Sequence, residues 1–331
     1  MLNQPELNTL SKSDPIDHFL LIKKLELRST RSGNDFLSTE LGDKTASLNA
    51  NIWEGFANIA AKASVGDVVK VTGTVEEYQN SLQIRVSTIR LAKQSDEVSP
   101  KDFLPRSNRN LEVMKDEFNK KIDSVSNKFL KKLLKEIFNG EKFEQFSNAP
   151  AGKSWHHAYV NGLIEHTLEI VKICELISEF HPELDKDLLI AGAMLHDIGK
   201  IEELSYESAF DYTDKGKLIG HIVIASNLVR DEIKKIPGFP EELENGLIHL
   251  ILSHQGKLEH ASPVVPKTAE AIALYQADEL SAKVNAYKNV IESELKPGSN
   301  WTRYIQLAET DLYKINLDNS SEESANKSLF D

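Results

Sequence analysis

The spacing of apolar residues changes once along this 331-residue chain, and the change separates two kinds of structure. Up to about residue 92, apolar and polar residues alternate in short runs, which is the pattern of half-buried β-strands. From residue 111 onwards apolar residues recur every three or four positions, as in amphipathic α-helices. We therefore expect a β domain followed by an all-α domain, and the length suits two domains.

Five strands are expected in the first domain, separated by turns rich in Gly, Asn and Asp. A helical stretch over residues 54–63 falls between the third and the fourth strand. Three strands, a helix and two strands is the order of the five-stranded OB-fold β-barrel, which binds single-stranded nucleic acid or oligosaccharide. The expected strands are residues 18–29, 36–41, 45–53, 67–78 and 81–92.

The helical part begins after a polar linker that contains prolines, residues 93–110. Residues 111–138 show helical spacing with many lysines, and further helices are expected over 160–180, 187–195, 219–236, 241–253 and 267–290. The resulting division is an OB-fold domain (1–95), a linker with a basic helical segment (96–142), an all-α domain (143–315) and a polar acidic tail (316–331).

Composition excludes several classes of protein. The only cysteine, Cys174, rules out an internal disulfide and a Cys-rich zinc site. No apolar run reaches the roughly 18–20 residues of a membrane span, and the N-terminus lacks the apolar region of a secretory signal, so we expect a cytoplasmic protein without membrane contact. The net charge of −12 disfavours non-specific coating of duplex DNA, although metal ions or a local basic groove could still hold a polyanion.

Histidines and aspartates inside apolar helical patterns are the main candidates for chemistry. A single buried histidine is commonly a hydrogen-bonded core residue, but a buried lone carboxylate is costly unless a cation or hydrogen bonds compensate it. Imidazoles and carboxylates that converge on a divalent metal would provide that compensation. The candidates, in chain order, are His166, His196, Asp197, His221, His254 and Asp278.

This ordered set, with the motif HDIGK at 196–200, resembles the two-metal form of the HD-domain metal-dependent phosphohydrolases. The resemblance implies that Asp197 bridges two ions and that Lys200 contacts a substrate phosphate or an oxygen on the metal. His249 and His260 are rivals of His254, which we prefer because it stands at a helix end beside a flexible loop. The implied ligands of the first ion are His166, His196 and Asp278, and those of the second are His221 and His254.

An OB-fold, a linker helix and an HD domain in this order resemble the YhaM-type 3′-to-5′ exoribonucleases of bacteria. The similarity extends over most of the chain and includes residues 154–167, 220–226, 252–271 and 277–287. It implies the removal of nucleotides from single-stranded 3′ ends, with manganese as the usual metal. We expect two Mn²⁺ ions per chain, Fe²⁺ or Mg²⁺ being compatible with the same donors. Single-stranded RNA is the expected partner, with single-stranded DNA and a homo-oligomer kept open.

Further candidates lie outside the ligand set. Lys200 and the pair His156–His157 could neutralise the scissile phosphate or protonate the leaving oxygen, and we take Asp197, Lys200 and His157 as catalytic. In the OB-fold, aromatic residues could stack on bases and a cation could contact the strand, although we expect at least two of the four aromatics to lie in the core. These nucleic-acid-binding candidates are Phe36, Trp53, Phe56, Tyr78 and Arg85.

Two other functions compete with this prediction. The first is a phosphohydrolase of dNTPs, cyclic nucleotides or alarmones, which an HD site alone would permit. The second is a nucleic-acid-binding protein with an inactive HD domain. The OB-fold argues against the first, and the intact set of ionisable residues argues against the second.

Overall fold

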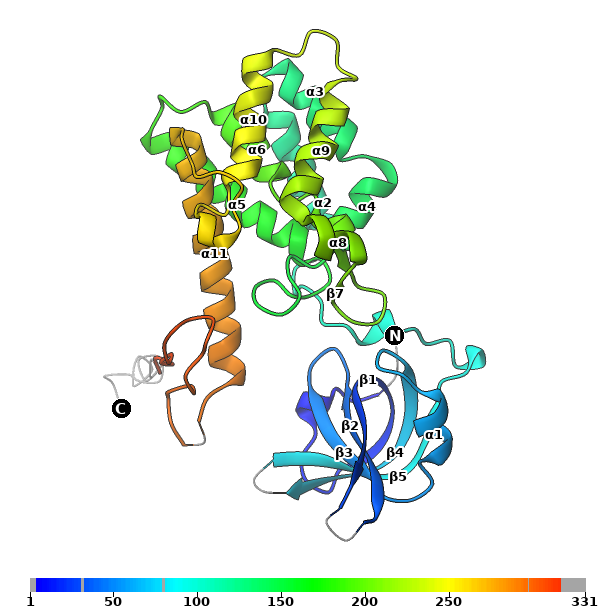
Figure 1. Ribbon diagram of the computed structural model, residues 1–331. Coiled ribbons are helices and arrows are strands. Elements are labelled where there is room, and N and C mark those ends of the chain that lie inside the picture. The colour runs from blue at the N-terminus through cyan, green and yellow to red at the C-terminus, as the bar shows by residue number, and fades with distance from the viewer. Residues whose placement is uncertain (1–3, 31–32, 79–80, 297, 317–331) are drawn as a thin grey trace, which may run out of the picture.

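The computed structural model describes residues 4–30, 33–78, 81–296 and 298–316, and shows a β-barrel below a taller helical domain (Figure 1). The acidic tail predicted for 316–331 therefore lies, apart from Asn316, outside the described residues. Among the described residues no helix has both the length and the apolar character that crossing a membrane requires.

The predicted OB-fold is confirmed. Its five strands close into a barrel in the order β1-β2-β3-β5-β4, and β3 pairs with β5 in parallel while the other neighbours are antiparallel. Alternate side chains such as Leu20, Val71 and Ile84 point inward and form the barrel core, as a period of two requires. The elements are β1 (Pro15–Ser29), β2 (Asp35–Gly42), β3 (Ser47–Ile52), α1 (Ala57–Lys62), β4 (Val68–Tyr78) and β5 (Ser81–Leu91).

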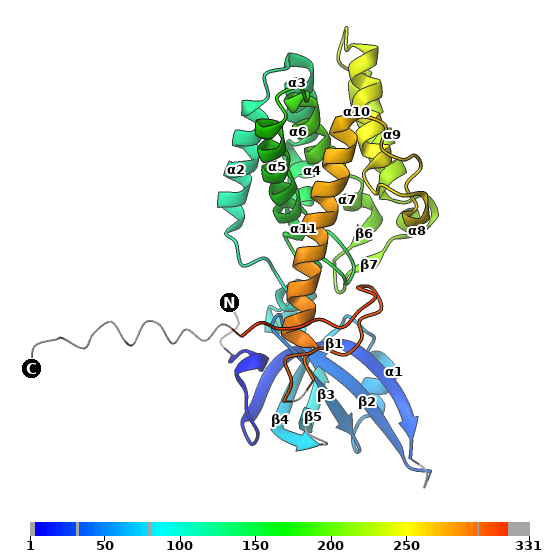
Figure 2. The same cartoon turned by 90° about the vertical axis from the view of Figure 1, so that its left-hand side faces the viewer.

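The second domain is a bundle of helices around one continuous apolar core. α5 and α6 pack against each other and carry much of this core, and most of the other helices contact one of the two (Figures 1 and 2). The helices are α2 (Leu111–Ser124), α3 (Lys128–Ile137), α4 (Gly140–Asn148), α5 (Gly162–Phe180), α6 (Lys186–Leu195), α7 (Lys200–Glu203), α8 (Asp214–Ile219), α9 (His221–Ile233), α10 (Glu241–Ser253) and α11 (Ala269–Ser293).

The helix expected over 111–138 is in fact two, α2 and α3. The chain breaks because the side chain of Asn127 accepts hydrogen bonds from the backbone N–H groups of Phe129 and Leu130, which caps a new helix. Asp187, at the start of α6, accepts from the N–H groups of Ser126 and Asn127 at 3.0 and 2.6 Å. Asp187 lies about 60 residues away in the sequence, so the local spacing of apolar residues could not reveal the break between α2 and α3.

The structure differs from the expected series of helices at three further places. The helix expected over 219–236 is divided at Gly220, whose φ of 79° ends α8 and sets the entry of α9. A short hairpin, β6 (Leu204–Ser205) with β7 (Asp211–Tyr212), interrupts the helices. After α11 the described residues, 294–296 and 298–316, form an irregular segment with isolated bridges between residue pairs such as Ile305 and Thr310.

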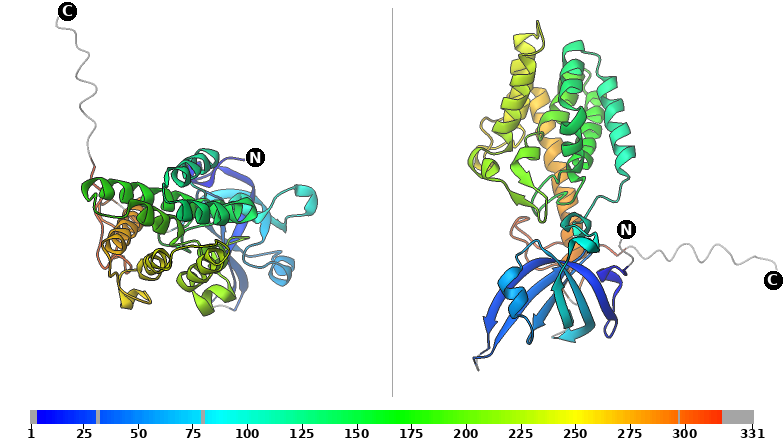
Figure 3. Two further views of the ribbon diagram at one scale, coloured as in Figure 1. Left: turned by 90° about the horizontal axis from the view of Figure 1, so that it is seen from above. Right: turned by 90° about the vertical axis from the view of Figure 1, so that its right-hand side faces the viewer.

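The barrel and the helical domain meet at a small apolar cluster. Leu21 and Val68 of the barrel pack there with Phe103 and Leu104 of the linker and with Val160 just before α5. The linker runs between the two domains, which Figure 3 shows from two further sides. This cluster joins one end of the barrel to the helical domain.

Candidate metal centre and nucleic-acid interface

Five helices bring the candidate metal ligands to one point in the helical domain. His166 lies in α5, His221 begins α9, His254 follows α10 and Asp278 lies in α11. Asp197 lies directly after His196, the residue that ends α6. All of these residues lie at facing ends or faces of their helices, so the packing of the bundle assembles the site.

Gly199 allows the turn after Asp197 to approach α9 closely. A Cβ atom at this position would lie 2.1 Å from the backbone oxygen of His221 and 2.8 Å from the backbone nitrogen of Ala225. Both distances are too short for any side chain, because the contacting atoms belong to the backbone. The glycine of the HDIGK motif therefore lets the first turn of α9 bring His221 to Asp197.

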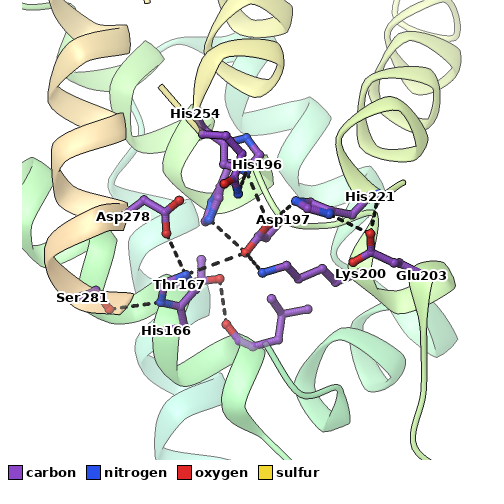
Figure 4. Close-up of polar contacts among 12 residues, drawn as sticks. His166, Thr167, His196, Asp197, Lys200, Glu203, His221, His254, Asp278 and Ser281 are labelled. Atoms are coloured by element: carbon purple, nitrogen blue, oxygen red, sulfur yellow. Dashed lines mark hydrogen bonds and ion pairs between the residues drawn. The ribbon is translucent and has the colours of Figure 1, made fainter. Parts of the chain in front are cut away.

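The carboxylate of Asp197 lies at the centre and directs one oxygen to each pair of histidines (Figure 4). Its Oδ2 atom is 3.2 Å from Nε2 of His196 and 3.8 Å from Nε2 of His166. Its Oδ1 atom is 3.4 Å from Nε2 of His221 and 3.6 Å from Nε2 of His254. The four imidazoles thus form two groups that share a single carboxylate.

Each imidazole also has an acceptor for its other nitrogen, Nδ1, either a carbonyl three residues earlier in its own helix or a side chain on another helix. A proton on Nδ1 that is donated to such an acceptor leaves the lone pair of Nε2 directed at the centre, which is the usual support of a metal-binding histidine. These acceptors are the carbonyl oxygen of Ala193 for His196 (2.8 Å), that of Ile251 for His254 (2.7 Å), the carboxylate of Glu203 for His221 (2.9 Å) and the hydroxyl of Ser281 for His166 (3.1 Å).

A chain of hydrogen bonds fixes the direction of the contact to His166. The hydroxyl of Ser281 donates to the carboxylate of Glu169 at 2.8 Å. Because its one proton is used there, the Ser281 oxygen accepts from Nδ1 of His166. Sequence reasoning found neither Ser281 nor Glu169, since no spacing signal separates them from other polar residues on the same helices.

The electrostatics keep most donors in the forms that bind a cation. Burial opposes ionisation of Asp197, but Lys200 and His196 outweigh it and hold the pKa of this carboxyl well below its usual range. Burial lowers the pKa of His166 well below its usual range, and with His196 it lowers the pKa of His254 to about 3. Burial also disfavours charge on His196, yet Asp197 raises the pKa of that imidazole above its ordinary value.

The residues present fit a divalent metal. Nε2 of His166, His196 and His221 and Oδ1 of Asp197 are buried with no hydrogen-bond partner among the described residues. Unpartnered buried acceptors are costly, and a cation would satisfy all four. Asp278 adds a second carboxylate, with Oδ1 3.1 Å from Nε2 of His166. The cluster is thus a divalent-metal site in its donor chemistry.

Two rival histidines lie away from this cluster. Nε2 of His249 accepts from the backbone N–H of Lys267 at 2.9 Å, which ties this ring to the loop before α11. His260 lies on the wall of the cavity beside the cluster, together with Lys257, and is exposed. His254 is the one of the three whose ring faces Asp197.

A cavity of about 410 Å³ opens beside the metal ligands, and it distinguishes the two adjacent histidines His156 and His157. His156 lines the cavity with Lys200 and Asp278, and both of its ring nitrogens are buried without a hydrogen-bond partner among the described residues. His157 is fully buried, both of its ring nitrogens also lack a hydrogen-bond partner among the described residues, and its Nε2 lies 3.3 Å from the carboxylate of Glu169. Of the two histidines, His156 is the one on the wall of this cavity.

Lys200 lies one turn after Asp197, and its Nζ is 2.7 Å from Asp197 Oδ2. Burial would lower the pKa of this ammonium, but the adjacent carboxylate raises it above the ordinary value, so the side chain carries a charge. Because Lys200 also lines the cavity, a buried positive charge faces the space beside the metal ligands.

On the barrel, four of the five predicted nucleic-acid contacts line one groove of about 1060 Å³: Phe36, Trp53, Tyr78 and Arg85. The rings of Phe36 and Trp53 stack with centroids 4.5 Å apart and planes 24° apart, and Trp53 remains half exposed. Phe56 is the exception, because it packs against a small apolar cluster that contains Ile59. Of the four aromatic candidates, only Phe56 packs against an apolar cluster in this way, whereas we expected at least two of them in the core.

The fold and the site define a protein that joins an OB-fold barrel to an HD domain, and comparison with known families agrees. The HD domain model matches residues 163–283, and the model described as an OB-fold nucleic acid binding domain matches residues 23–92. The chain is 32% identical to the 3′-5′ exoribonuclease YhaM of Geobacillus sp. (strain WCH70) over 302 residues, which cover 91% of this chain and 92% of that protein. The chain belongs to the YhaM family, and the predicted resemblance is confirmed.

Two solved structures of replication protein A domains from Methanococcus maripaludis are also similar to part of the chain. One is a crystal structure of a domain, 20% identical, which covers 27% of this chain and 94% of that chain with a TM-score of 0.24. The other is a solution NMR structure of the second OB-fold domain, 23% identical, which covers 24% of this chain and 84% of that chain with a TM-score of 0.19.

The support of His221 by Glu203 leads to a first prediction. Glu203→Ala removes the acceptor for Nδ1 of His221, so we expect a loss of Mn²⁺ affinity of about 10- to 100-fold with the fold retained. Glu202→Ala is the matched control, because this neighbouring carboxylate pairs with Lys215 instead. Calorimetric titration of both variants with Mn²⁺ measures the difference, and equal affinities would contradict the role of Glu203.

Proposed function

We propose that this chain is a metal-dependent 3′-to-5′ exoribonuclease with two metal ions in its HD domain. The observation that carries the proposal is the position of Asp197 between two pairs of histidines, with one carboxylate oxygen toward each pair. Membership of the YhaM family supports the reaction and its polarity. The proposed ligands are His166, His196 and Asp278 for one ion, His221 and His254 for the other, and Asp197 for both.

Two divalent ions at this site would polarise the scissile phosphodiester and supply the attacking nucleophile. The residues of the chain bind and orient the substrate around that chemistry. Lys200 presents a buried positive charge that would hold a non-bridging oxygen of the phosphate. His156, with two unpartnered ring nitrogens beside the same cavity, would donate a hydrogen bond to the phosphate or to the leaving oxygen. We therefore propose that His156, which lines the cavity, has the catalytic role that the sequence predicted for His157.

We propose Mn²⁺ as the metal, with Fe²⁺ and Mg²⁺ as competitors. Four imidazoles and two carboxylates form a mixed nitrogen and oxygen donor set, which suits manganese and iron better than magnesium. Cysteine takes no part, since Cys174 is buried and burial raises the pKa of its thiol to about 12. The donor set therefore differs from that of a structural zinc site.

Single-stranded RNA is the proposed substrate, and single-stranded DNA is a second one. The stacked pair Phe36 and Trp53 offers π-surface to unpaired bases in the barrel groove, and Arg85 on the same groove offers a charge to the backbone. A nucleotide phosphohydrolase would need the cavity in the HD domain but not this groove. The groove is therefore the observation that favours a polynucleotide over a free nucleotide.

The metal centre can be tested at its shared carboxylate. Asp197→Ala removes a donor from both proposed ions, so we expect hydrolysis of single-stranded RNA to be abolished and bound Mn²⁺ to fall from two ions per chain to none. Asp231→Ala, an exposed carboxylate paired with Lys234, is the control and should behave like the wild type. Elemental analysis and a gel assay read the two quantities, and an active Asp197→Ala would rule out the shared ligand.

The barrel groove can be tested with substrates of different length. Trp53→Ala should raise KM for an RNA of about 20 nucleotides by roughly 5- to 150-fold, since a base–aromatic stack is worth about 1–3 kcal/mol. It should leave KM for a trinucleotide unchanged, because a trinucleotide at the metals does not reach the barrel. Trp53→Phe keeps an aromatic face and should retain most of the affinity. An equal effect of Trp53→Ala on both lengths would mean that the barrel helps to form the active site.

Strand requirement and polarity can be tested together. The proposed active site lies in a cavity among helices, so it should admit a single strand and exclude a duplex. A 5′-labelled RNA stem with a single-stranded 3′ tail should shorten from the 3′ end and stop near the stem. A denaturing gel follows the ladder, and tails of graded length measure how far the metals lie from the entrance. Cuts within loops or loss of the 5′ label first would contradict the proposal.

A further inference from the structure

The cavity beside the metal ligands has a second end that neither the metal centre nor the barrel groove uses. Its inner wall carries Lys200 and Asp278, which belong to the proposed centre. Its outer wall carries the large side chains Trp155, Tyr287 and Leu307, from three different segments of the chain. We call these three residues the collar.

Helix geometry places the collar away from the metals and toward the barrel. Tyr287 follows Asp278 by nine residues in α11, which corresponds to about 13.5 Å along the helix axis. Figures 1 and 2 show that the C-terminal half of α11 descends from the helical domain to the level of the barrel. Trp155 also lines an adjoining cavity of about 400 Å³ with Val290 and Ser293, still farther along α11. The collar therefore lies on the side of the cavity from which a strand held by the barrel would arrive.

Leu307 is presented by a well-anchored hairpin rather than by a loose loop. The backbone N–H of Ile305 donates to the carbonyl of Thr310 at 2.8 Å, which closes the tip. Behind it, buried Thr302 and Leu312 are joined by two hydrogen bonds of 2.9 Å. At the tip Leu307 is 67% exposed, so a large apolar side chain is held in solvent beside the cavity. Leu307 thus adds an apolar face to the wall of the cavity.

The charges around the collar favour a base over a phosphate. Two lysines stand on the wall, but Nζ of Lys283 is 2.6 Å from Glu279, and Nζ of Lys257 is 3.4 Å from Glu259. Glu309, at the hairpin tip, adds a further negative charge to the wall. With its cations paired and an acid beside them, this end attracts a phosphate weakly and instead offers aromatic and apolar faces. Nucleic-acid bases are the part of a single strand that such faces bind.

We propose that Trp155, Tyr287 and Leu307 bind the base of the nucleotide on the 5′ side of the scissile phosphate. The inference rests on the proposed exoribonuclease activity and adds a second base-binding site, between the barrel and the metals. In a strand whose 3′ end lies at the metals, the portion toward the barrel is 5′ of the cut, and the collar lies on that side. The collar would hold the strand in place while the terminal nucleotide leaves.

The test compares two substrates and two sites. Trp155→Ala and Tyr287→Ala should each raise KM about tenfold for a trinucleotide and for an RNA of about 20 nucleotides, because every substrate crosses the collar. Trp53→Ala in the barrel groove should affect the long RNA only. Trp155→Phe and Tyr287→Phe keep a ring and should recover most of the affinity. Phe180→Ala, an exposed aromatic at the end of α5, is the matched control and should leave both KM values unchanged.

The outcomes separate the two proposals. A wild-type protein that does not degrade RNA with Mn²⁺ overturns the exoribonuclease and the collar with it. If the wild type is active but the collar variants leave KM for the trinucleotide unchanged, the collar alone is overturned. Titration with Mn²⁺ accompanies each variant, and a parallel loss of Mn²⁺ affinity would also overturn the collar, because those residues would then support the metal ligands rather than the base.

Discussion

A buried carboxylate surrounded by imidazoles is the interaction on which the HD domain of this protein depends. Asp197 is almost inaccessible to solvent, and five side chains, four imidazoles and the ammonium of Lys200, direct nitrogen atoms at its two oxygens. An isolated charge in such a place would be strongly destabilising. The packed helices bring Lys200 and the proposed ions to this carboxylate, and these positive charges offset the cost of burying it. The arrangement of ligands that the proposed chemistry needs is therefore also the one that allows Asp197 to be buried.

The surrounding contacts explain why this arrangement is rigid. Each imidazole has an acceptor for its second nitrogen, taken from a backbone carbonyl, a carboxylate or a hydroxyl. Gly199 lets two backbone segments touch, which sets the distance between Asp197 and His221. Rings fixed in this way do not need to be reordered when an ion binds, so affinity is not lost to conformational entropy.

In the proposed exoribonuclease, the barrel and the helical domain each contact a part of the single strand. The barrel groove offers stacked aromatic rings, and the helical domain offers a cavity with a charged inner end and an aromatic outer end. The apolar cluster around Phe103 joins the barrel to the helical domain. In the proposed exoribonuclease, the distance between groove and cavity sets the length of strand that benefits from both sites.

The sequence by itself determined the two domains, the strand order of the barrel and the ordered set of histidines and aspartates. The spacing of apolar residues is a local property, and a motif such as HDIGK can be recognised without knowing which residues lie next to it in space. The tertiary structure alone decided which of two adjacent residues serves the site: Glu203 rather than Glu202 contacts His221, and His156 rather than His157 lines the cavity. It also decided that α2 and α3 are separate helices and that residues 307–309 line the cavity beside the proposed metal ligands. These features depend on contacts between segments far apart in the chain, and such contacts arise only when the helices pack.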